Sequence, residues 1–106
     1  MWLVNGNNLE MAEGDYGVVL PVTIKGTTLT ANDSVKFIFK DALNGTEILT
    51  KEYTNLTQNT ASLVLTEAES ALFPVGSYVY SLDWYQDGSF MNNIIKCASF
   101  KVGDKV

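Results

Sequence analysis

The sequence predicts an all-β protein, an immunoglobulin-like Greek-key β-sandwich of about seven strands with one short helical turn between strands. Short apolar runs recur along the chain, and Gly, Asn and Asp separate them, which is typical of sandwiches and barrels. Within several runs, apolar and polar residues alternate with a period of two, as in strands that bury one face. A small barrel is the alternative architecture.

Length and composition favour a single domain that spans residues 1–106. Hydrophobic residues make up 46% of the chain, which is enough for one core. The fold therefore needs neither a metal ion nor a disulfide to hold it together.

Five strands are expected in the first part of the chain, over residues 9–12, 16–25, 34–40, 47–54 and 59–65. Val18, Leu20, Val22 and Ile24 share one face of the second strand. Pro21 cannot donate a hydrogen bond to a sheet, so this strand is expected at an edge or a bulge.

The third and fourth strands form a hairpin in this prediction. Val35, Phe37 and Phe39 alternate with Lys36, Ile38 and Lys40 and are expected to point into the core. Asn44-Gly45 is a strong signal for a type I′ turn, because both central positions of that turn need a positive φ.

The pattern changes after residue 65. Thr66-Glu67-Ala68-Glu69 is a capping box, so one helical turn is expected before Phe73-Pro74 ends it. A long strand follows in which Tyr78, Tyr80, Leu82 and Trp84 share one face. Asp87-Gly88 predicts a hairpin turn.

The last strand is expected over residues 90–102. Its apolar pattern slips by one residue, which suggests a bulge near residues 96–98. Cys97 lies in this apolar strand, and we expect it to be a small core residue.

The ionisable residues exclude several functions. The chain has 12 acidic residues and 7 basic ones, all Lys, and a net charge of −5. An acidic chain without Arg is poorly suited to binding nucleic acid, where neutralisation of phosphates supplies much of the affinity. It has no His, which removes the commonest general base and zinc ligand. We therefore expect no catalytic residues, no metal site and no cofactor, although a carboxylate pair of the glycosidase type remains open.

No membrane or secretion signal stands out in the sequence. The longest apolar stretch, residues 17–22, is far too short to span a bilayer. Residues 1–5 lack the basic start and the apolar length of a signal peptide. Synthesis in the cytoplasm and no membrane partner are the expectations.

Some aromatic and apolar residues do not fit the predicted inner faces and are candidates for an interface. A terminal apolar segment at Trp2, Leu3 and Val4 is costly to leave in water, so it either folds back on the sandwich or docks on a neighbouring subunit. Other rings are expected on an outer face or at strand ends, where they serve protein or sugar surfaces, unless loops cover them. The candidate interface residues are Trp2, Leu3, Val4, Tyr53, Tyr85 and Phe90.

The order of features resembles a known family. Residues 9–15 precede an apolar strand, residues 35–39 follow a polar loop, and the most specific segment, residues 65–82, combines a strand, a capped turn and Gly-x-Tyr-x-Tyr. Asp87-Gly88 and residues 98–102 close the pattern. Together these resemble the N-terminal domain of upper baseplate proteins from tailed phages of Gram-positive bacteria, and related small prophage proteins.

The resemblance implies an immunoglobulin-like sandwich that serves as an attachment module in a virion and carries no catalytic residues. The expected function is that of a phage or prophage structural protein that contacts other virion proteins and forms a homo-oligomer. Upper baseplate proteins continue into longer regions, whereas this chain ends at Val106, so a stand-alone protein and a fragment both remain open. The alternative function is a carbohydrate-binding module that stacks sugars on Tyr53, Tyr85 or Trp2.

Overall fold

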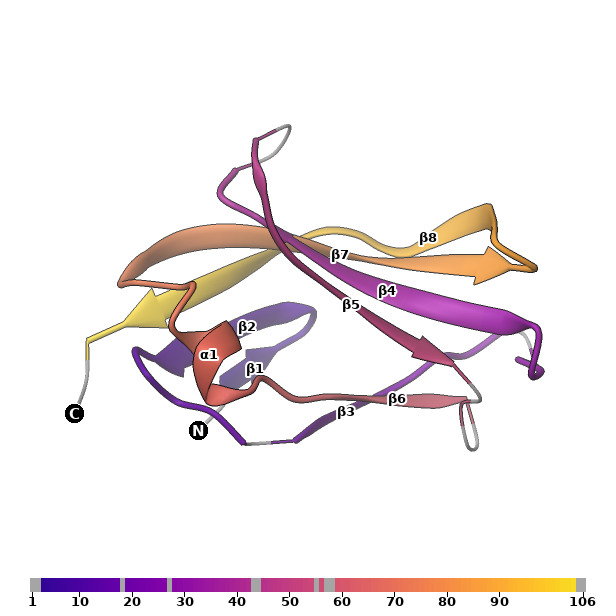
Figure 1. Ribbon diagram of the computed structural model, residues 1–106, viewed down its shortest axis with the longest axis horizontal. Coiled ribbons are helices and arrows are strands. Elements are labelled where there is room, and N and C mark those ends of the chain that lie inside the picture. Colours follow the sequence, from indigo (N-terminus) through magenta and orange to yellow (C-terminus); the bar gives the residue numbers. More distant parts are fainter. Residues whose placement is uncertain are drawn as a thin grey trace.

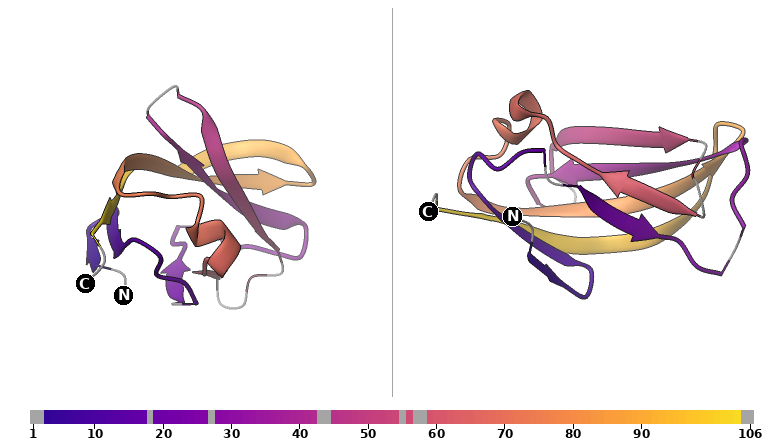
Figure 2. Two further views of the ribbon diagram at one scale, coloured as in Figure 1. Left: turned by 60° about the vertical axis from the view of Figure 1, so that its left-hand side comes forward. Right: turned by 90° about the horizontal axis from the view of Figure 1, so that it is seen from below.

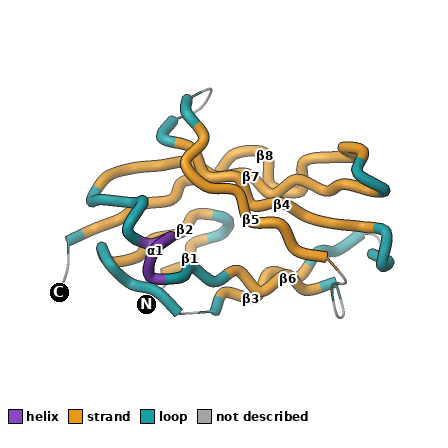
Figure 3. The backbone as a smooth tube through the Cα atoms, in the orientation of Figure 1, coloured by secondary structure: helices purple, strands orange, loops and turns teal. Residues whose placement is uncertain are grey.

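The computed structural model describes residues 3–17, 19–26, 28–42, 45–54, 56 and 59–104. Within this part the chain forms eight strands and one short helix (Figures 1 and 3). The elements are β1 (Leu3–Asn5), β2 (Asn8–Ala12), β3 (Leu20–Thr23), β4 (Asp33–Lys40), β5 (Glu47–Thr54), β6 (Thr60–Leu63), α1 (Glu67–Ser70), β7 (Gly76–Gln86) and β8 (Ser89–Gly103).

The strands form two sheets that face each other, as Figures 1 and 2 show. The larger sheet has the order β1-β2-β8-β7-β4-β5, and the smaller sheet pairs β3 with β6. Strands β2 and β8 are parallel, and the other neighbours are antiparallel. The order β8-β7-β4-β5 opposite β3-β6 is that of strands G, F, C and C′ opposite B and E in immunoglobulin domains. The all-β sandwich is confirmed, and β1 is a strand in addition to those predicted.

Alternation along the larger sheet places one layer of rings in the core. Phe37 and Phe39 on β4, Tyr80 on β7, Phe100 on β8 and Phe73 after α1 are all buried. The centroids of neighbouring rings lie 5.1–6.4 Å apart, mostly in tilted or edge-to-face contacts. Such pairs add about 0.5–1.5 kcal/mol each beyond the burial of their area.

Two tyrosines of β7 fix their rings through backbone carbonyls. The hydroxyl of Tyr78 donates to the carbonyl oxygen of Pro74 at 2.6 Å, four residues back along the chain. This matches the tyrosine corner of immunoglobulin sandwiches, at the corner before strand F. The hydroxyl of Tyr80 donates to the carbonyl oxygen of Asn7 and so joins β7 to the β1–β2 hairpin. Burial raises the pKa of Tyr80 to about 12, so this hydroxyl stays a donor at neutral pH.

Inward-facing side chains of β5 join the larger sheet to the segment after β6. The hydroxyl of Tyr53 accepts a hydrogen bond from the backbone N–H of Val64 at 3.3 Å. The ammonium group of Lys51 donates to the carbonyl oxygen of Val64 at 2.5 Å and to the carboxylate of Glu69 at 2.8 Å. Both backbone groups of Val64 are therefore satisfied from the opposite sheet, which closes this side of the sandwich.

The capping box at α1 is confirmed. The hydroxyl of Thr66 accepts from the backbone N–H of Glu69 at 3.2 Å, and the carboxylate of Glu69 accepts from the N–H of Thr66 at 2.9 Å. Glu69 thus serves both the cap and Lys51. The single turn carries the chain from one sheet to the other and delivers Phe73 into the core.

The second predicted strand is shorter than the sequence suggested, since β3 covers only Leu20–Thr23 and Val18 lies outside the described residues. Gly17, with φ at 76°, interrupts the extended backbone before it. Pro21 does lie on an edge strand, as predicted. The backbone N–H of Ile24 points toward β6 and donates to the carbonyl oxygen of Asn59. Because N–H groups alternate in direction along a strand, the backbone nitrogen of Pro21 points away from β6. Pro21 cannot donate a hydrogen bond there, so it hinders pairing of that edge with another strand.

The connection from β4 to β5 differs from the predicted two-residue turn. A longer loop over residues 41–46 closes with Asp41, whose N–H donates to Thr46 and whose carboxylate accepts from the N–H of Thr46 at 2.8 Å. Gly45 does not have the positive φ that a type I′ turn requires, and Asn44 lies outside the described residues. The Asp41 carboxylate therefore binds the backbone N–H of Thr46, which a two-residue turn would have paired with a backbone carbonyl.

We expect the contribution of Glu69 to stability to depend on pH. Burial raises the pKa of Glu69, but hydrogen bonds from Lys51 and Thr66 outweigh it and hold this pKa below the ordinary value of 4.5. A lowered native pKa stabilises the fold above the unfolded value and loses that stabilisation as the pH falls below it. Glu69→Gln should reduce the free energy of unfolding by about 1 kcal/mol at pH 7, with a smaller loss near pH 3. Urea unfolding at both pH values measures this.

The control is Glu67→Gln, two residues earlier in the same helix, on an exposed side chain, whereas Lys51 pairs with Glu69. Its effect should stay within about 0.5 kcal/mol at either pH. Equal losses for the two variants at pH 7 would contradict the role assigned to Glu69.

Candidate functional site

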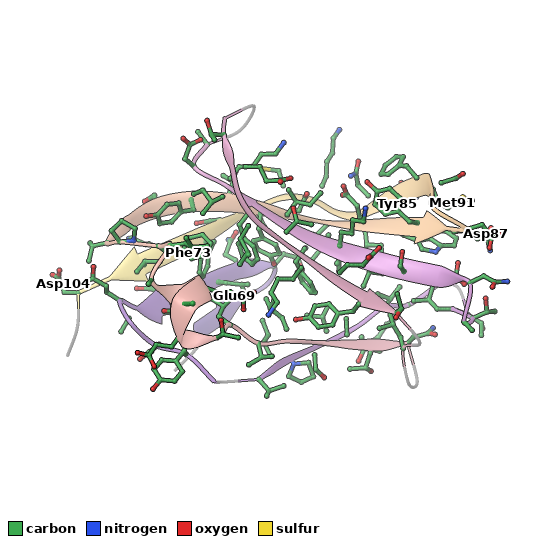
Figure 4. The ribbon with its side chains drawn as sticks, in the orientation of Figure 1. Glu69, Phe73, Tyr85, Asp87, Met91 and Asp104 are labelled. Atoms are coloured by element: carbon green, nitrogen blue, oxygen red, sulfur yellow. The ribbon has the colours of Figure 1, made fainter. Side chains whose placement is uncertain are left out.

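The hairpin between β7 and β8 forms one end of the molecule, far from α1 (Figures 1 and 4). Asp87 and Gly88 have φ values of 51° and 81°, so the predicted Asp-Gly turn is confirmed. In this hairpin Gly76 pairs with Val102 and Gln86 pairs with Ser89. An advance of ten residues along β7 therefore matches an advance of thirteen residues along β8. Three extra residues therefore bulge out of β8, where the sequence indicated one.

Apolar side chains gather on the outer face at this end. Tyr85 and Phe90 are cross-strand partners, and their rings meet edge-to-face with centroids 5.7 Å apart. The ammonium group of Lys36 lies 4.2 Å from the centroid of the Tyr85 ring. Phe90 and Met91 keep 53% and 45% of their surface exposed. We call Lys36, Tyr85, Phe90 and Met91 the hairpin corner.

A buried carboxylate supports the hairpin corner from the inner face. Asp33 is 2% exposed, and its carboxylate accepts from the indole N–H of Trp84 at 2.9 Å and from the backbone N–H of Thr30 at 2.7 Å. The backbone N–H of Asp87 donates to the carbonyl oxygen of Asn32 at 3.0 Å. The loop before β4 is thereby tied to both the strand and the turn that carry the corner.

These donors determine the charge state of Asp33. The backbone hydrogen bond from Thr30, followed by the side-chain bond from Trp84, holds the pKa of Asp33 below its ordinary value despite burial. The N–H groups of Thr30 and Trp84 donate to the ionised carboxylate of Asp33, and hydrogen bonds to a charged acceptor are stronger than those between neutral groups. The corner therefore rests on a charged anchor at neutral pH.

A shallow depression lies further along the outer face of the larger sheet. We call it the central depression; its outward-facing lining is Ile38, Lys40, Val79, Ser81, Lys96 and Cys97. Cys97 is exposed here, so the prediction that it is a core residue is wrong. One of the three bulges explains this, because Lys96 and Cys97 together span the gap opposite Ser81 and line the same outer depression.

The candidate interface residues of the sequence analysis have different positions. Tyr85 and Phe90 lie together in the hairpin corner. Tyr53 faces inward, edge-on to Phe37 at 5.9 Å between centroids, so its expected position on an outer face is corrected.

The N-terminal candidates are described in part. Leu3 and Val4 form the backbone of the edge strand β1, which pairs antiparallel with β2, and Trp2 lies outside the described residues. The backbone thus folds back on the sheet, which was one of the two expected outcomes. Among the strands of the described residues, β1 lies at the end of the sheet order and pairs on one edge only.

Several residues of the site carried no clear signal in the sequence. Met91 and Lys96 gain their outward positions from bulges, which shift the alternation of β8. The anchoring role of Asp33 depends on Trp84, which is 51 residues away along the chain. Only the period-two pattern of β4 indicated that Lys36 points outward.

Comparison with known proteins gave no matching family model, curated protein or solved structure. No group of three or more Cys, Asp or Glu side chains placed to bind a metal ion occurs among the described residues. In the same part of the chain, no helix has the length and apolar character needed to cross a membrane.

Replacing Asp33 should loosen the hairpin corner. Asp33→Asn keeps the size of the side chain but places an amide N–H₂ where donors from Thr30 or Trp84 now bond. We expect a lower unfolding midpoint and faster hydrogen exchange at the amide of Asp87. The exposed Asp87→Asn is the control, since Asn also tolerates positive φ, and its midpoint should not change. An unchanged unfolding midpoint for Asp33→Asn would contradict the role of Asp33 in holding the hairpin corner.

Proposed function

We propose that this chain is an attachment or assembly module of a tailed-phage or prophage particle and that it acts through protein–protein contacts. The observation that carries the proposal is the hairpin corner. The exposed ring of Phe90 lies beside the half-buried ring of Tyr85, and both are held on paired strands rather than on a free loop. Exposed apolar patches that contain aromatic and Met residues are typical of protein interfaces.

The geometry favours a preformed interface. Tyr85 is held between Lys36 and Phe90, and Asp33 anchors the adjacent Trp84 from the other face. Side chains that are already ordered lose little conformational entropy when a partner binds. This supports a rigid docking surface of the kind that assemblies use.

The assignment to a phage particle has a separate basis. It rests on the resemblance of residues 65–82 to upper baseplate domains, and the described structure is compatible with that resemblance. The capped turn at α1, the buried Phe73 and the Tyr78 corner give that segment a physical role in crossing between sheets. Virion localisation and contacts with other virion proteins follow from the proposal.

Carbohydrate binding is less well supported. A sugar needs an open aromatic face for stacking, but Tyr53 packs against Phe37, and Lys36 lies over the ring of Tyr85. Among the described candidates for such a platform, no ring is left open in the way that the alternative requires.

The proposal predicts that the chain is a component of purified particles and that the hairpin corner holds it there. Phage particles from the strain that carries the gene are analysed by mass spectrometry. The wild-type chain should be present at a fixed ratio to other structural proteins. The double variant Phe90→Ser, Met91→Ser should be depleted at least about tenfold, which corresponds to a loss of about 1.4 kcal/mol in binding.

The control is Val19→Ser, which removes a similarly exposed apolar side chain on the segment before β3. It should enter particles as the wild type does. Circular dichroism should show an unchanged unfolding midpoint for every variant, because exposed positions contribute little to stability. Absence of the wild-type chain from particles, or normal incorporation of the double variant, would refute the proposal.

A further inference from the structure

The central depression has a lining suited to an acidic and apolar partner. Ile38, Val79 and Cys97 give it an apolar floor, and Lys40 and Lys96 provide two positive charges. No carboxylate belongs to the lining, although the whole chain has a net charge of −5. Glu47 lies opposite Lys40 on β5, whereas the bulge places Lys96 opposite Ser81. Lys96 is therefore the less compensated of the two charges.

The end of the molecule that carries α1 has the complementary composition. Leu72 and Val75 remain 46% and 49% exposed on either side of the buried Phe73. Glu67 is exposed in the first turn of α1, and Glu13 bonds through its N–H to Gly103 at the same end. We call Glu13, Glu67, Leu72 and Val75 the α1 end.

Two further observations describe the charge at the α1 end. Glu69 has its carboxylate occupied by Lys51, so the free negative charge of the helix is that of Glu67. Burial, and after it the charge of Glu13, raises the pKa of Tyr78. Exposed apolar groups and carboxylates thus lie together here.

The two surfaces cannot meet within one molecule. The central depression faces outward from the larger sheet, whereas α1 lies on its inner side, next to the smaller sheet (Figures 1 and 2). We propose that the α1 end of a second copy of this chain docks in the central depression, with an apolar side chain on the floor and Glu67 near Lys96. This inference rests on the proposed function and names a partner and a surface for it.

The arrangement has a consequence for assembly. Each copy offers one depression and one α1 end, so the contact is heterologous and not a two-fold dimer. Repeating it gives a closed ring or an open chain of subunits. The hairpin corner lies next to the depression on the same outer face, toward the β7–β8 turn, with Lys36 two residues before Ile38 on β4.

Charge reversal on each surface tests the inference with the full-length chain. Sedimentation velocity of the wild type should show association that grows with protein concentration and weakens as salt screens the charges. Lys96→Glu and Glu67→Lys should each weaken self-association about tenfold, because each places like charges together. Lys25→Glu, an equal change of charge on an exposed residue after β3, should associate as the wild type does.

Mixing the two reversed variants gives the decisive readout. In an equimolar mixture, every contact between one variant and the other pairs opposite charges, so the mixture should recover an association in which the two variants alternate and which neither forms alone. Leu72→Ser, which leaves all charges in place, should also weaken association. Circular dichroism checks that each variant is folded.

A wild type that stays monomeric at all concentrations and salt levels would overturn the inference. So would wild-type association of either reversed variant, or a mixture that recovers nothing. Incorporation into particles is measured separately, so a monomeric chain that still enters particles through the hairpin corner would leave the proposed function standing.

Discussion

Five aromatic side chains on the inner side of the larger sheet, Phe37, Phe39, Phe73, Tyr80 and Phe100, pack against one another to form the centre of the core. Among the described strands, ladder hydrogen bonds run within the larger sheet or within the smaller one, so side-chain packing must join the two layers. In antibody domains a disulfide joins strands B and F, and the position two residues after the corner tyrosine holds its second Cys. Tyr80 occupies that position here, and the sole Cys of the chain faces outward.

The inner layer determines what the outer face can present. Because every second residue of β4 and β7 is committed to the core, the intervening residues, such as Lys36 and Tyr85, must point outward. Bulges in β8 then redirect Met91, Lys96 and Cys97. The hairpin corner and the central depression therefore both result from the bulges that form where the longer strand β8 pairs with the shorter strand β7.

Much of the fold was predictable from local chemistry. Alternation identified β4 and the inner face of β7, the Thr66 capping box located α1, and Asp87-Gly88 located the hairpin turn. These signals are local because each depends on backbone geometry within a few residues. The bulge at Lys96 was visible as a slip in the pattern, but the direction of Cys97 was not, since a bulge can send its extra residue to either face.

The remaining errors come from contacts between distant segments. Tyr53 was a candidate interface residue, yet it faces inward, and its hydroxyl and the ammonium group of Lys51 bond to Val64 on the other side of the sandwich. Asp33 carried no signal in the sequence, yet it is buried and accepts a hydrogen bond from Trp84. No spacing along one strand reports such a partner, so the hairpin corner was predicted only through Tyr85 and Phe90.

A matched pair of substitutions tests the aromatic core most directly. Phe39→Leu removes a ring that touches three others, whereas Phe90→Leu removes a ring on the outer face. We expect urea unfolding to show a loss of about 1–3 kcal/mol for Phe39→Leu and a change within about 0.5 kcal/mol for Phe90→Leu. Equal losses for the two variants would contradict the claim that the inner aromatic layer holds the two sheets together.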